Sequence, residues 1–245
     1  SVFVGSVNCK MDKLKKNNEG YNVNTPSSVC AVRGTEFDVA TGADGKTVLQ
    51  VTEGTVSLEG MSQSVLVAKN QESAVAIGGE PEPVKIIKRK DWEKWANESS
   101  SDVKGKESSI IEGCLAKAQK LDSDIQQLER KGDESREKSI ELFKQAQEAK
   151  AAGDNDKATK LSGDAERERI TYASQTTVAF YQASRIELVK SVADNAYTSA
   201  ESKESLQENY DLISGIYLKY FNKYIKPIID AAKVRQEAAE KRKKK

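Results

Sequence analysis

The fold of the first part of the chain is decided by the stretch Thr25-Pro-Ser-Ser-Val-Cys-Ala-Val-Arg-Gly-Thr-Glu-Phe37. Two runs rich in β-branched and apolar residues, 29–32 and 35–39, have the length of strands. The pair Arg33-Gly34 separates them, and a glycine inside a strand pattern marks a bulge or a close approach of the backbone. The stretch therefore predicts two successive strands with a kink between them.

Two interpretations of this kink stay open. In the first, Arg33 and Glu36 are exposed recognition groups, and Phe37 beside them is a further candidate contact. In the second, which is the commoner arrangement for a glycine bulge, Val32 and Phe37 are buried and Arg33 pairs locally with Glu36. An exposed ion pair adds only about 0–1 kcal/mol, so it would fix local geometry more than stability.

Further strand-sized runs continue on both sides of this stretch. They are expected at residues 21–24, 47–52, 55–58, 64–68, 73–77 and 84–87. Turn residues separate them: Gly42-Ala-Asp-Gly45 supplies glycine for a positive φ and an aspartate that caps its own backbone. Strands that recur roughly every 8–12 residues are typical of an all-β sandwich, barrel or solenoid.

The composition changes near residue 91. Three of the four prolines and nine of the fifteen glycines lie in residues 1–90, and the remainder is poor in both. We predict an α+β protein with two segregated domains. An all-β domain covers 1–90, and a linker and helix start cover 91–106. An antiparallel bundle of long helices covers 107–245.

Apolar residues at helical spacing run through this second part, beginning with Ile111, Cys114 and Ala118. Gly-Asp pairs at 132–133 and 153–154 predict the ends of a first and a second helix. A third helix is expected over about 156–200, and a fourth from Leu206 to Ile228. Short turns between long helices indicate antiparallel neighbours. Residues 142–158 are also faintly similar to one tetratricopeptide hairpin, although such repeats need about three copies.

Aromatic residues supply further candidate contacts. A stripe of tyrosines lies in the fourth helix at helical spacing: Tyr210, Tyr217, Tyr220 and Tyr224. It is either a recognition surface or, as we favour, a seam of the bundle. Trp92 and Trp95 lie among basic residues and share one face of a helical turn. They either contact nucleic acid or a membrane or, as we favour, anchor the first helix onto the β-domain.

The composition excludes several classes of function. The 245 residues include no histidine, which excludes imidazole acid–base catalysis, Ser/His/Asp or Cys/His pairs and histidine metal ligands. A net charge of +1 gives no bulk reason to expect nucleic acid. Acidic pairs such as Asp122/Asp124 and Glu166/Glu168 lie on different helix faces. We therefore predict no enzyme, no cofactor and no metal site, with a carboxylate-only enzyme as the least favoured alternative.

The three cysteines allow at most one intrachain disulfide. Cys9 and Cys30 are the only plausible pair, although a hairpin that turns near residues 16–20 would not place them directly opposite. Cys114 lies on the apolar face of its helix, so we expect a buried thiol.

The stretch at 25–37 resembles the core motif of the FecR-type domain family, in which a Thr-Pro pair leads into Val-Arg-Gly-Thr-Glu-Phe. The family pattern continues here with Asp44-Gly45, Val51-Thr-Glu-Gly-Thr-Val56 and Val65-Leu-Val67, so the resemblance spans about residues 5–80. It implies an extracytoplasmic all-β binding domain, and the founding members are iron-transport signalling regulators. The chain departs from those regulators because no apolar run approaches the roughly 20 residues of a transmembrane helix. It begins at Ser1, which we interpret as a processed or trimmed start.

These observations predict a non-enzymatic structural or protein-docking module of the bacterial envelope, in the periplasm of a Gram-negative-type bacterium. The alternative is the periplasmic part of a transmembrane FecR-like signalling regulator. The expected partner is a protein, either a second copy or another envelope component, and not nucleic acid. It would contact the strand at Val2–Val7 and the Tyr210–Tyr224 face. Membrane contact is expected only through the Lys241–Lys245 tail or a removed anchor.

Overall fold

The computed structural model describes residues 4–10, 21–32, 35–87, 92, 95, 98–99 and 103–243, with side chains up to residue 236. Arg33 and the side chains of Lys241–Lys245 therefore lie outside the described residues. The chain forms two compact units, which are described separately. The first contains Ser1–Lys120 and Arg185–Lys245, and the second contains Leu121–Ser184.

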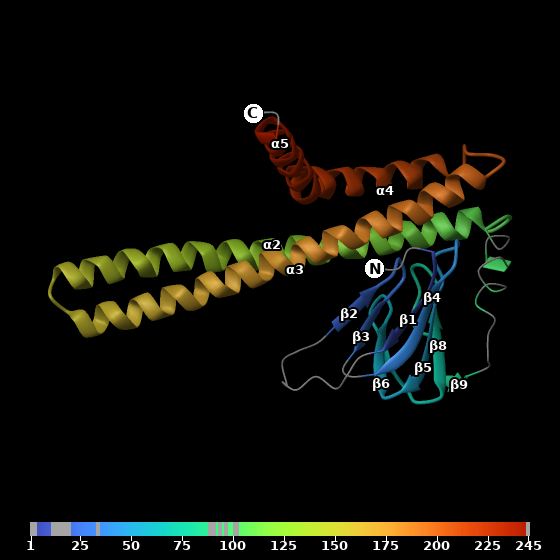
Figure 1. Ribbon diagram of the computed structural model, residues 1–245, viewed down its shortest axis with the longest axis horizontal. Helices are drawn as coiled ribbons and strands as arrows, with labels where there is room; N and C mark the ends of the chain where they lie inside the picture. The colour runs from blue at the N-terminus through green and yellow to red at the C-terminus, as the bar shows by residue number, and fades with distance from the viewer. Residues whose placement is uncertain are drawn as a thin grey trace. The chain divides into compact units, whose positions relative to one another are not determined.

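Strands paired with antiparallel neighbours form the β-domain of the first unit (Figure 1). They are β1 (Gly5–Lys10), β2 (Tyr21–Asn24), β3 (Val29–Val32), β4 (Glu36–Thr41), β5 (Thr47–Glu53), β6 (Thr55–Glu59), β7 (Ser64–Ala68), β8 (Gln71–Val75) and β9 (Lys85–Ile86). One sheet has the order β1-β4-β5-β8-β9, and the other has the order β2-β3-β6-β7. The predicted strands are confirmed, although β8 begins and ends two residues earlier than expected.

One hydrophobic core lies between the two sheets, so the fold is a sandwich. Alternate residues of β4, β5 and β6 supply its centre and are fully buried: Phe37, Val39, Leu49, Val51, Val56 and Leu58. The pairing of β4 with β5 shifts between Glu36 and Phe37, next to the predicted kink. Phe37 belongs to this core because its alternation with Val39 places it on the inner face. It is therefore not a surface contact, which corrects its place among the candidates.

The turn between β2 and β3 forms a cluster of buried hydroxyl groups. Thr25 Oγ1 accepts a hydrogen bond from the backbone N–H of Ser28 at 2.9 Å. Thr47 Oγ1, in β5, donates to Thr25 Oγ1 at 2.8 Å and accepts from Ser27 Oγ at 2.7 Å. Since β5 belongs to the other sheet, the hydroxyl groups of residues 25–28 connect the two sheets by hydrogen bonds.

Helix α2 (Glu107–Ala151) is a single helix of 45 residues. The predicted helix end at Gly132-Asp133 is wrong, because one interior glycine costs only about 1 kcal/mol relative to alanine. Gly153, by contrast, follows the true end of the helix. Its φ is +83°, and the N–H groups of Gly153 and Asp154 donate to the carbonyls of Lys150 and Ala149.

Helix α3 (Asn155–Ser199) corresponds to the predicted third helix. It is antiparallel to α2 within the second unit, since Gly132 faces Tyr172, whereas Ser139, further along α2, bonds to the earlier residue Ala165. The predicted antiparallel arrangement is confirmed. Each of the two helices has 45 residues, whereas a whole tetratricopeptide repeat has about 34, so the single-repeat interpretation is not supported.

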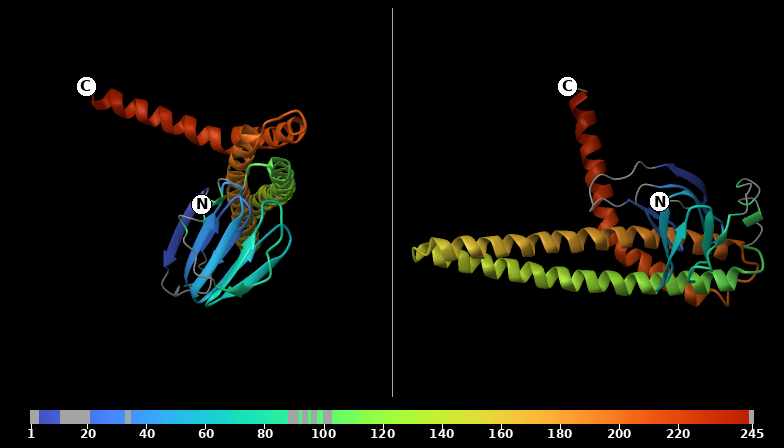
Figure 2. Two further views of the ribbon diagram at one scale, coloured as in Figure 1. Left: turned by 90° about the vertical axis from the view of Figure 1, so that its right-hand side faces the viewer. Right: turned by 90° about the horizontal axis from the view of Figure 1, so that it is seen from below.

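The predicted fourth helix is divided into three parts. These are α4 (Gln207–Tyr220), a π-helix (Phe221–Ile225) and α5 (Lys226–Lys243). Pro227 explains the division, because it has no N–H and its ring displaces the carbonyl of Lys223 four residues earlier. The wide π turn absorbs this mismatch. Figure 2 shows α5 continuing from the end of α4 in a new direction.

Two glycines bring α2 directly against the β-domain within the first unit. A Cβ atom on Gly113 would lie 2.4 Å from the carbonyl oxygen of Ile77, and one on Gly78 would lie 2.6 Å from Gly113 Cα. One turn further along α2, Lys117 is 2% exposed and donates to the carbonyl of Gly60 at 3.0 Å. The start of α2 and the sandwich are therefore in direct backbone contact.

An antiparallel β-domain followed by long helices confirms the predicted α+β class. The strands end at Ile86 and α2 begins at Glu107, on either side of the predicted link over 91–106. Independent folding of the two predicted domains stays a prediction. Among the described helices, none combines the length and the apolar character that crossing a membrane requires.

Candidate functional site

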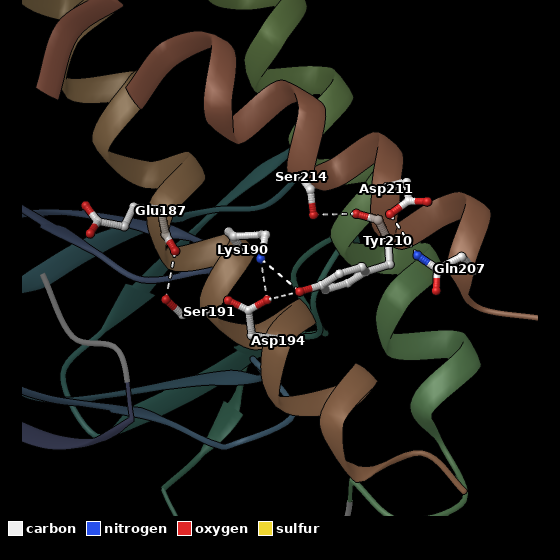
Figure 3. A network of polar contacts seen from close by, with 8 residues as sticks. All are labelled: Glu187, Lys190, Ser191, Asp194, Gln207, Tyr210, Asp211 and Ser214. Atoms are coloured by element: carbon white, nitrogen blue, oxygen red, sulfur yellow. Dashed lines mark hydrogen bonds and ion pairs between the residues drawn. The ribbon is translucent and has the colours of Figure 1, made fainter. Parts of the chain in front are cut away.

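A network of polar side chains joins α3 to α4 within the first unit (Figure 3). Lys190 and Asp194, one turn apart on α3, form an ion pair. Tyr210 of α4 donates its hydroxyl hydrogen to Asp194 Oδ1 at 2.7 Å and accepts a hydrogen bond from Lys190 Nζ at 3.2 Å. These three groups satisfy one another and fix α4 on α3. Lys190 and Asp194 are not among the predicted candidates, although an i,i+4 pair of opposite charge is a readable signal.

Aromatic rings surround the ammonium group of Lys190. Its Nζ atom lies 4.7 Å from the centroid of the Tyr210 ring and 5.9 Å from that of Tyr217. Tyr197 stacks on Tyr210 with ring centroids 4.0 Å apart and an interplanar angle of 13°. Such cation–π contacts contribute about 0.5–2 kcal/mol each, depending on how far the cation is desolvated.

The environment sets the protonation of this network. Burial lowers the pKa of Lys190, but the hydrogen bonds to Asp194 and Tyr210 outweigh it, so the pKa lies above its ordinary value. Burial raises the pKa of Tyr210, and the hydrogen bond to Asp194 adds to this effect. Burial also raises the pKa of Tyr217. At neutral pH the lysine is charged and both tyrosines are neutral, which suits a structural contact rather than proton transfer.

The predicted tyrosine stripe is divided between core and surface. Tyr220 is buried, whereas Tyr210, Tyr217 and Tyr224 are half-buried. The rings of Tyr220 and Tyr224 stack with centroids 6.3 Å apart. Tyr220 therefore lies in the seam of the bundle, as we favoured, whereas the other three tyrosines are partly in the seam and partly at the surface.

Of the two charged candidates near the kink, the structure describes Glu36 and not Arg33. Arg33 lies outside the described residues, so its predicted pairing with Glu36 is not described. Glu36 is half-buried, and its carboxylate lies 3.1 Å from Lys10 Nζ on the neighbouring strand β1. Glu36 therefore links two strands of one sheet.

Trp92 and Trp95 meet edge to face, with ring centroids 5.7 Å apart, as their spacing predicts. Both are half-buried. The basic residues Lys88–Lys90 before them lie outside the described residues, so a joint basic and aromatic surface is not described.

All three cysteines are free thiols. Cys9 and Cys30 lie in different sheets, and both pack at the core between these sheets. The candidate disulfide is not formed in the structure, and the pairing stays a prediction. Burial raises the pKa of Cys30 to about 12 and also raises the pKa of Cys114, which is the expected buried thiol.

Beyond Leu121 and Ile125, the seam of the second unit is filled with small side chains. Between Ile125 and Ile186, each buried hydrophobic residue is an alanine: Ala146, Ala149, Ala158, Ala165, Ala179 and Ala183. Alanines let two helices approach closely. As a result, Ser139 Oγ of α2 donates to the backbone carbonyl of Ala165 on α3 at 2.9 Å.

Large apolar side chains lie on the outside of the same helices. Ile140 is 61% exposed, Phe143 is 55% exposed and Ile170 is 57% exposed. An open groove of about 380 Å³ lies beside Ile140 and Phe143, and Ala165 and Arg169 are on its α3 side. An exposed apolar patch with a charged rim is typical of a protein-interaction site. We call Ile140 and Phe143, which line this groove, the outer patch. Helical periodicity marks them as apolar positions but does not reveal that they are uncovered.

The acidic pair Glu166/Glu168 is held by basic side chains. Glu168 pairs with Lys138, and Glu166 accepts two hydrogen bonds from Arg169 at 2.7 and 2.6 Å. These hydrogen bonds lower the pKa of both carboxyl groups and keep them ionised, whereas a general acid needs a raised pKa. Within the part of the chain that the structure describes, no group of three or more His, Cys, Asp or Glu residues is placed to hold a metal ion.

Comparison with known proteins identifies the β-domain. Residues 4–57, from β1 into β6, match the family model described as FecR protein, and the helices lie outside this match. The resemblance drawn from residues 25–37 is thereby confirmed. No curated protein matches the chain.

Two crystal structures are similar over part of the chain, and both are of a provisionally assigned anti-sigma factor from Parabacteroides distasonis. They are 19% and 18% identical to it, with TM-scores of 0.30 and 0.32, and the similarity covers 34% and 38% of this chain. The chain spans 38% and 43% of their lengths, which is less than half of each.

Proposed function

We propose that this protein is a non-enzymatic docking module of the bacterial envelope, in which the helical hairpin binds a protein partner through the outer patch. One observation carries the proposal: the hairpin buries alanines in its seam and leaves Ile140, Phe143 and Ile170 more than half exposed. Burial of apolar surface contributes about 25 cal/mol per Å², so a partner that covers these side chains gains free energy that the hairpin by itself does not.

The proposed location is outside the cytoplasm, in the periplasm, and the FecR-type domain supports it. Residues 4–57 match the FecR family model, and the resemblance implies a domain that lies outside the cytoplasm. The free thiols do not oppose this location. Cys30 and Cys114 are buried, so they are protected from oxidation there.

A binding role agrees with the chemistry of the charged groups. Among the carboxylates of this histidine-free chain, Glu166 and Glu168 have lowered pKa values, so neither suits a general acid. The Lys190 network likewise holds helices together rather than presenting a group that titrates near neutral pH.

The match to the FecR model also favours a second candidate function, the periplasmic part of a transmembrane FecR-like signalling regulator. The two candidates differ in what is encoded before Ser1. A signal peptide or lipid-attachment sequence supports the docking module, whereas a transmembrane helix after a cytoplasmic domain supports the regulator.

Site-specific photo-cross-linking in a Gram-negative host tests the docking role. A benzophenone amino acid replaces Phe143 in the outer patch or, as the control, Gln127, which is exposed on another face of α2. We expect a cross-linked product from position 143 that disappears when Ile140→Glu is added, while the thermal midpoint stays unchanged. The mass of the product distinguishes a second copy from another protein.

The docking role is wrong if position 143 gives no more product than position 127, or if Ile140→Glu leaves the product intact. Osmotic-shock fractionation of the same cells tests the compartment separately. Retention of the chain with a cytoplasmic marker would contradict the extracytoplasmic location.

A further inference from the structure

The segment from residue 217 to residue 245 concentrates positive charge. It contains ten Lys and Arg against three Asp and Glu, whereas residues 1–216 contain 29 against 35. A net charge of +7 therefore stands against −6 on the rest of the chain. The described part of this basic segment has one acidic residue, Asp230. Its basic residues are Lys219, Lys223, Lys226, Lys233 and Arg235.

The same segment exposes aliphatic side chains. Each residue from 226 to 236 is exposed, including Ile228 at 55% and Val234 at 66%, and Leu218 of α4 is also exposed. Figure 2 shows α5 as a single helix beyond the π turn. A helix without a packed face is marginal in water, so a surface that covers it would stabilise it.

Lysines and tyrosines alternate where α4 leads into α5. Lys219 Nζ lies 4.7 Å from the centroid of the Tyr220 ring, and Lys223 Nζ lies 5.5 Å from that of Tyr224. Tyrosine is enriched at membrane–water interfaces, and lysine lays its aliphatic stem along apolar surface while its ammonium stays in water. The Lys190 network anchors this segment, because it fixes α4 on α3 (Figure 3).

We propose that the basic segment, residues 217–245, binds the surface of an anionic lipid bilayer. The charge is complementary, since clusters of four to eight Lys or Arg on a helix are typical of segments that bind anionic lipid. Leu218, Ile228 and the half-exposed tyrosine Tyr224 add shallow apolar contacts in the headgroup region. The proposal does not depend on the outer patch, which lies in the other compact unit.

The distribution of the side chains favours a bilayer over an acidic protein groove. A groove recognises one face of a helix through residues three, four and seven apart. Ile228 and Val234 are six residues apart, which is about 240° around a helix, so they do not share a face. Adsorption that is mainly electrostatic does not require one apolar face, and long lysine and arginine side chains reach a planar surface from several positions.

Co-sedimentation of the full chain with sucrose-loaded vesicles tests the proposal. One vesicle population is phosphatidylcholine with about one third phosphatidylglycerol, and the other is phosphatidylcholine alone. We expect binding to the first population, a fall in binding as salt is raised, and little binding to the second.

Charge reversal in the segment supplies the decisive comparison. The test variant carries Lys226→Glu, Lys233→Glu and Arg235→Glu, and the control carries Lys144→Glu, Lys150→Glu and Lys160→Glu. All six side chains are exposed, and the change in net charge is identical. The test variant should lower the partition coefficient roughly a hundredfold, and the control severalfold at most.

Ile228→Gln, which leaves the charge unchanged, should lower binding a few-fold and shows that an apolar contact is made. Equal losses in the two charge-reversal variants would mean bulk attraction only, and would overturn the proposal. So would equal binding to both vesicle populations or no binding to either. Complete displacement by soluble polyglutamate, together with no effect of Ile228→Gln, would assign the segment to an acidic protein instead.

Discussion

Helix α2 is buried differently in the two compact units, although its apolar residues have the same periodicity throughout. In the first unit, Ile110, Ile111 and Cys114 are buried where the helix starts at the β-domain. In the second unit, beyond Ile125, Ile140 and Phe143 are exposed and the buried hydrophobic residues are alanines. Periodicity therefore selects a helix face, whereas burial depends on how many other elements cover that face.

The glycines of α2 show the same contrast. Only glycine fits at position 113, because any Cβ atom there would lie 2.4 Å from the carbonyl oxygen of Ile77. Position 132 has room for a larger residue, because a Cβ atom there would lie 3.6 Å from Gln175 Cβ and from the Tyr172 ring, which is ordinary van der Waals distance.

The largest expected effect comes from Gly113→Ala. The new methyl group must displace the backbone at Ile77, so we expect the free energy of unfolding to fall by about 3 kcal/mol or more. Gly132→Ala is the control, and it should raise the free energy by about 0.5–1 kcal/mol, since alanine favours the helix. Urea denaturation of both variants measures the difference. Similar effects at the two positions would break the contrast between the units.

A second pair of variants compares buried and exposed isoleucines. Ile111→Ala leaves a cavity in a fully buried site and should cost about 2–5 kcal/mol. Ile140→Ala removes a side chain that is 61% exposed and should cost less than about 1 kcal/mol. Thermal and chemical denaturation give both values. A large cost at Ile140 would show that the outer patch is already covered, for example by a second copy.

The buried Lys117 of the first unit should make the free energy of unfolding depend on pH. Burial lowers the pKa of Lys117 from 10.5 to about 8, and the charge of Arg185 adds to this effect. Between those pH values the unfolded chain binds a proton that the folded chain does not. The free energy of unfolding should therefore rise with pH across this window, by up to about 3 kcal/mol in total.

Lys117→Met should lack this rise. Groups with raised pKa values, such as Lys190 and Tyr210, act in the opposite direction, but they are common to both proteins and cancel in the difference. Denaturation curves from pH 7 to about 10.5 measure that difference, and Lys120→Met controls for the loss of one charge on the same helix. Parallel pH profiles for the wild type and Lys117→Met would contradict the assignment.

The smallest expected effect concerns the tyrosine hydroxyl of the Lys190 network. Tyr210→Phe keeps the ring that stacks on Tyr197 and removes the hydrogen bonds to Asp194 and Lys190, at a cost of about 1 kcal/mol. Amide exchange in α4 should become faster. Tyr181→Phe, at an exposed position of the second unit, should change stability by less than about 0.5 kcal/mol. No difference between the two variants would mean that the network does not fix α4.

The class of the fold and the kind of β-domain could both be predicted from local features of the sequence. Strand-length runs separated by Gly and Asp turns are local features, and residues 25–37 match a motif whose hydroxyl groups and apolar positions hold the two sheets together. The long helices and the turn at Gly153-Asp154 are also local, because helical spacing and a positive φ involve only neighbouring residues.

Tertiary structure decided the rest. Helix α2 continues through Gly132 because the cost of one glycine is small beside the packing along the helix. Phe37 and Tyr220 are buried while Ile140 and Ile170 are exposed, although all four are large and apolar or aromatic. The physical reason is that burial depends on contacts between segments far apart in the chain. A side chain's own periodicity fixes its direction, and only the neighbouring elements determine whether anything covers it.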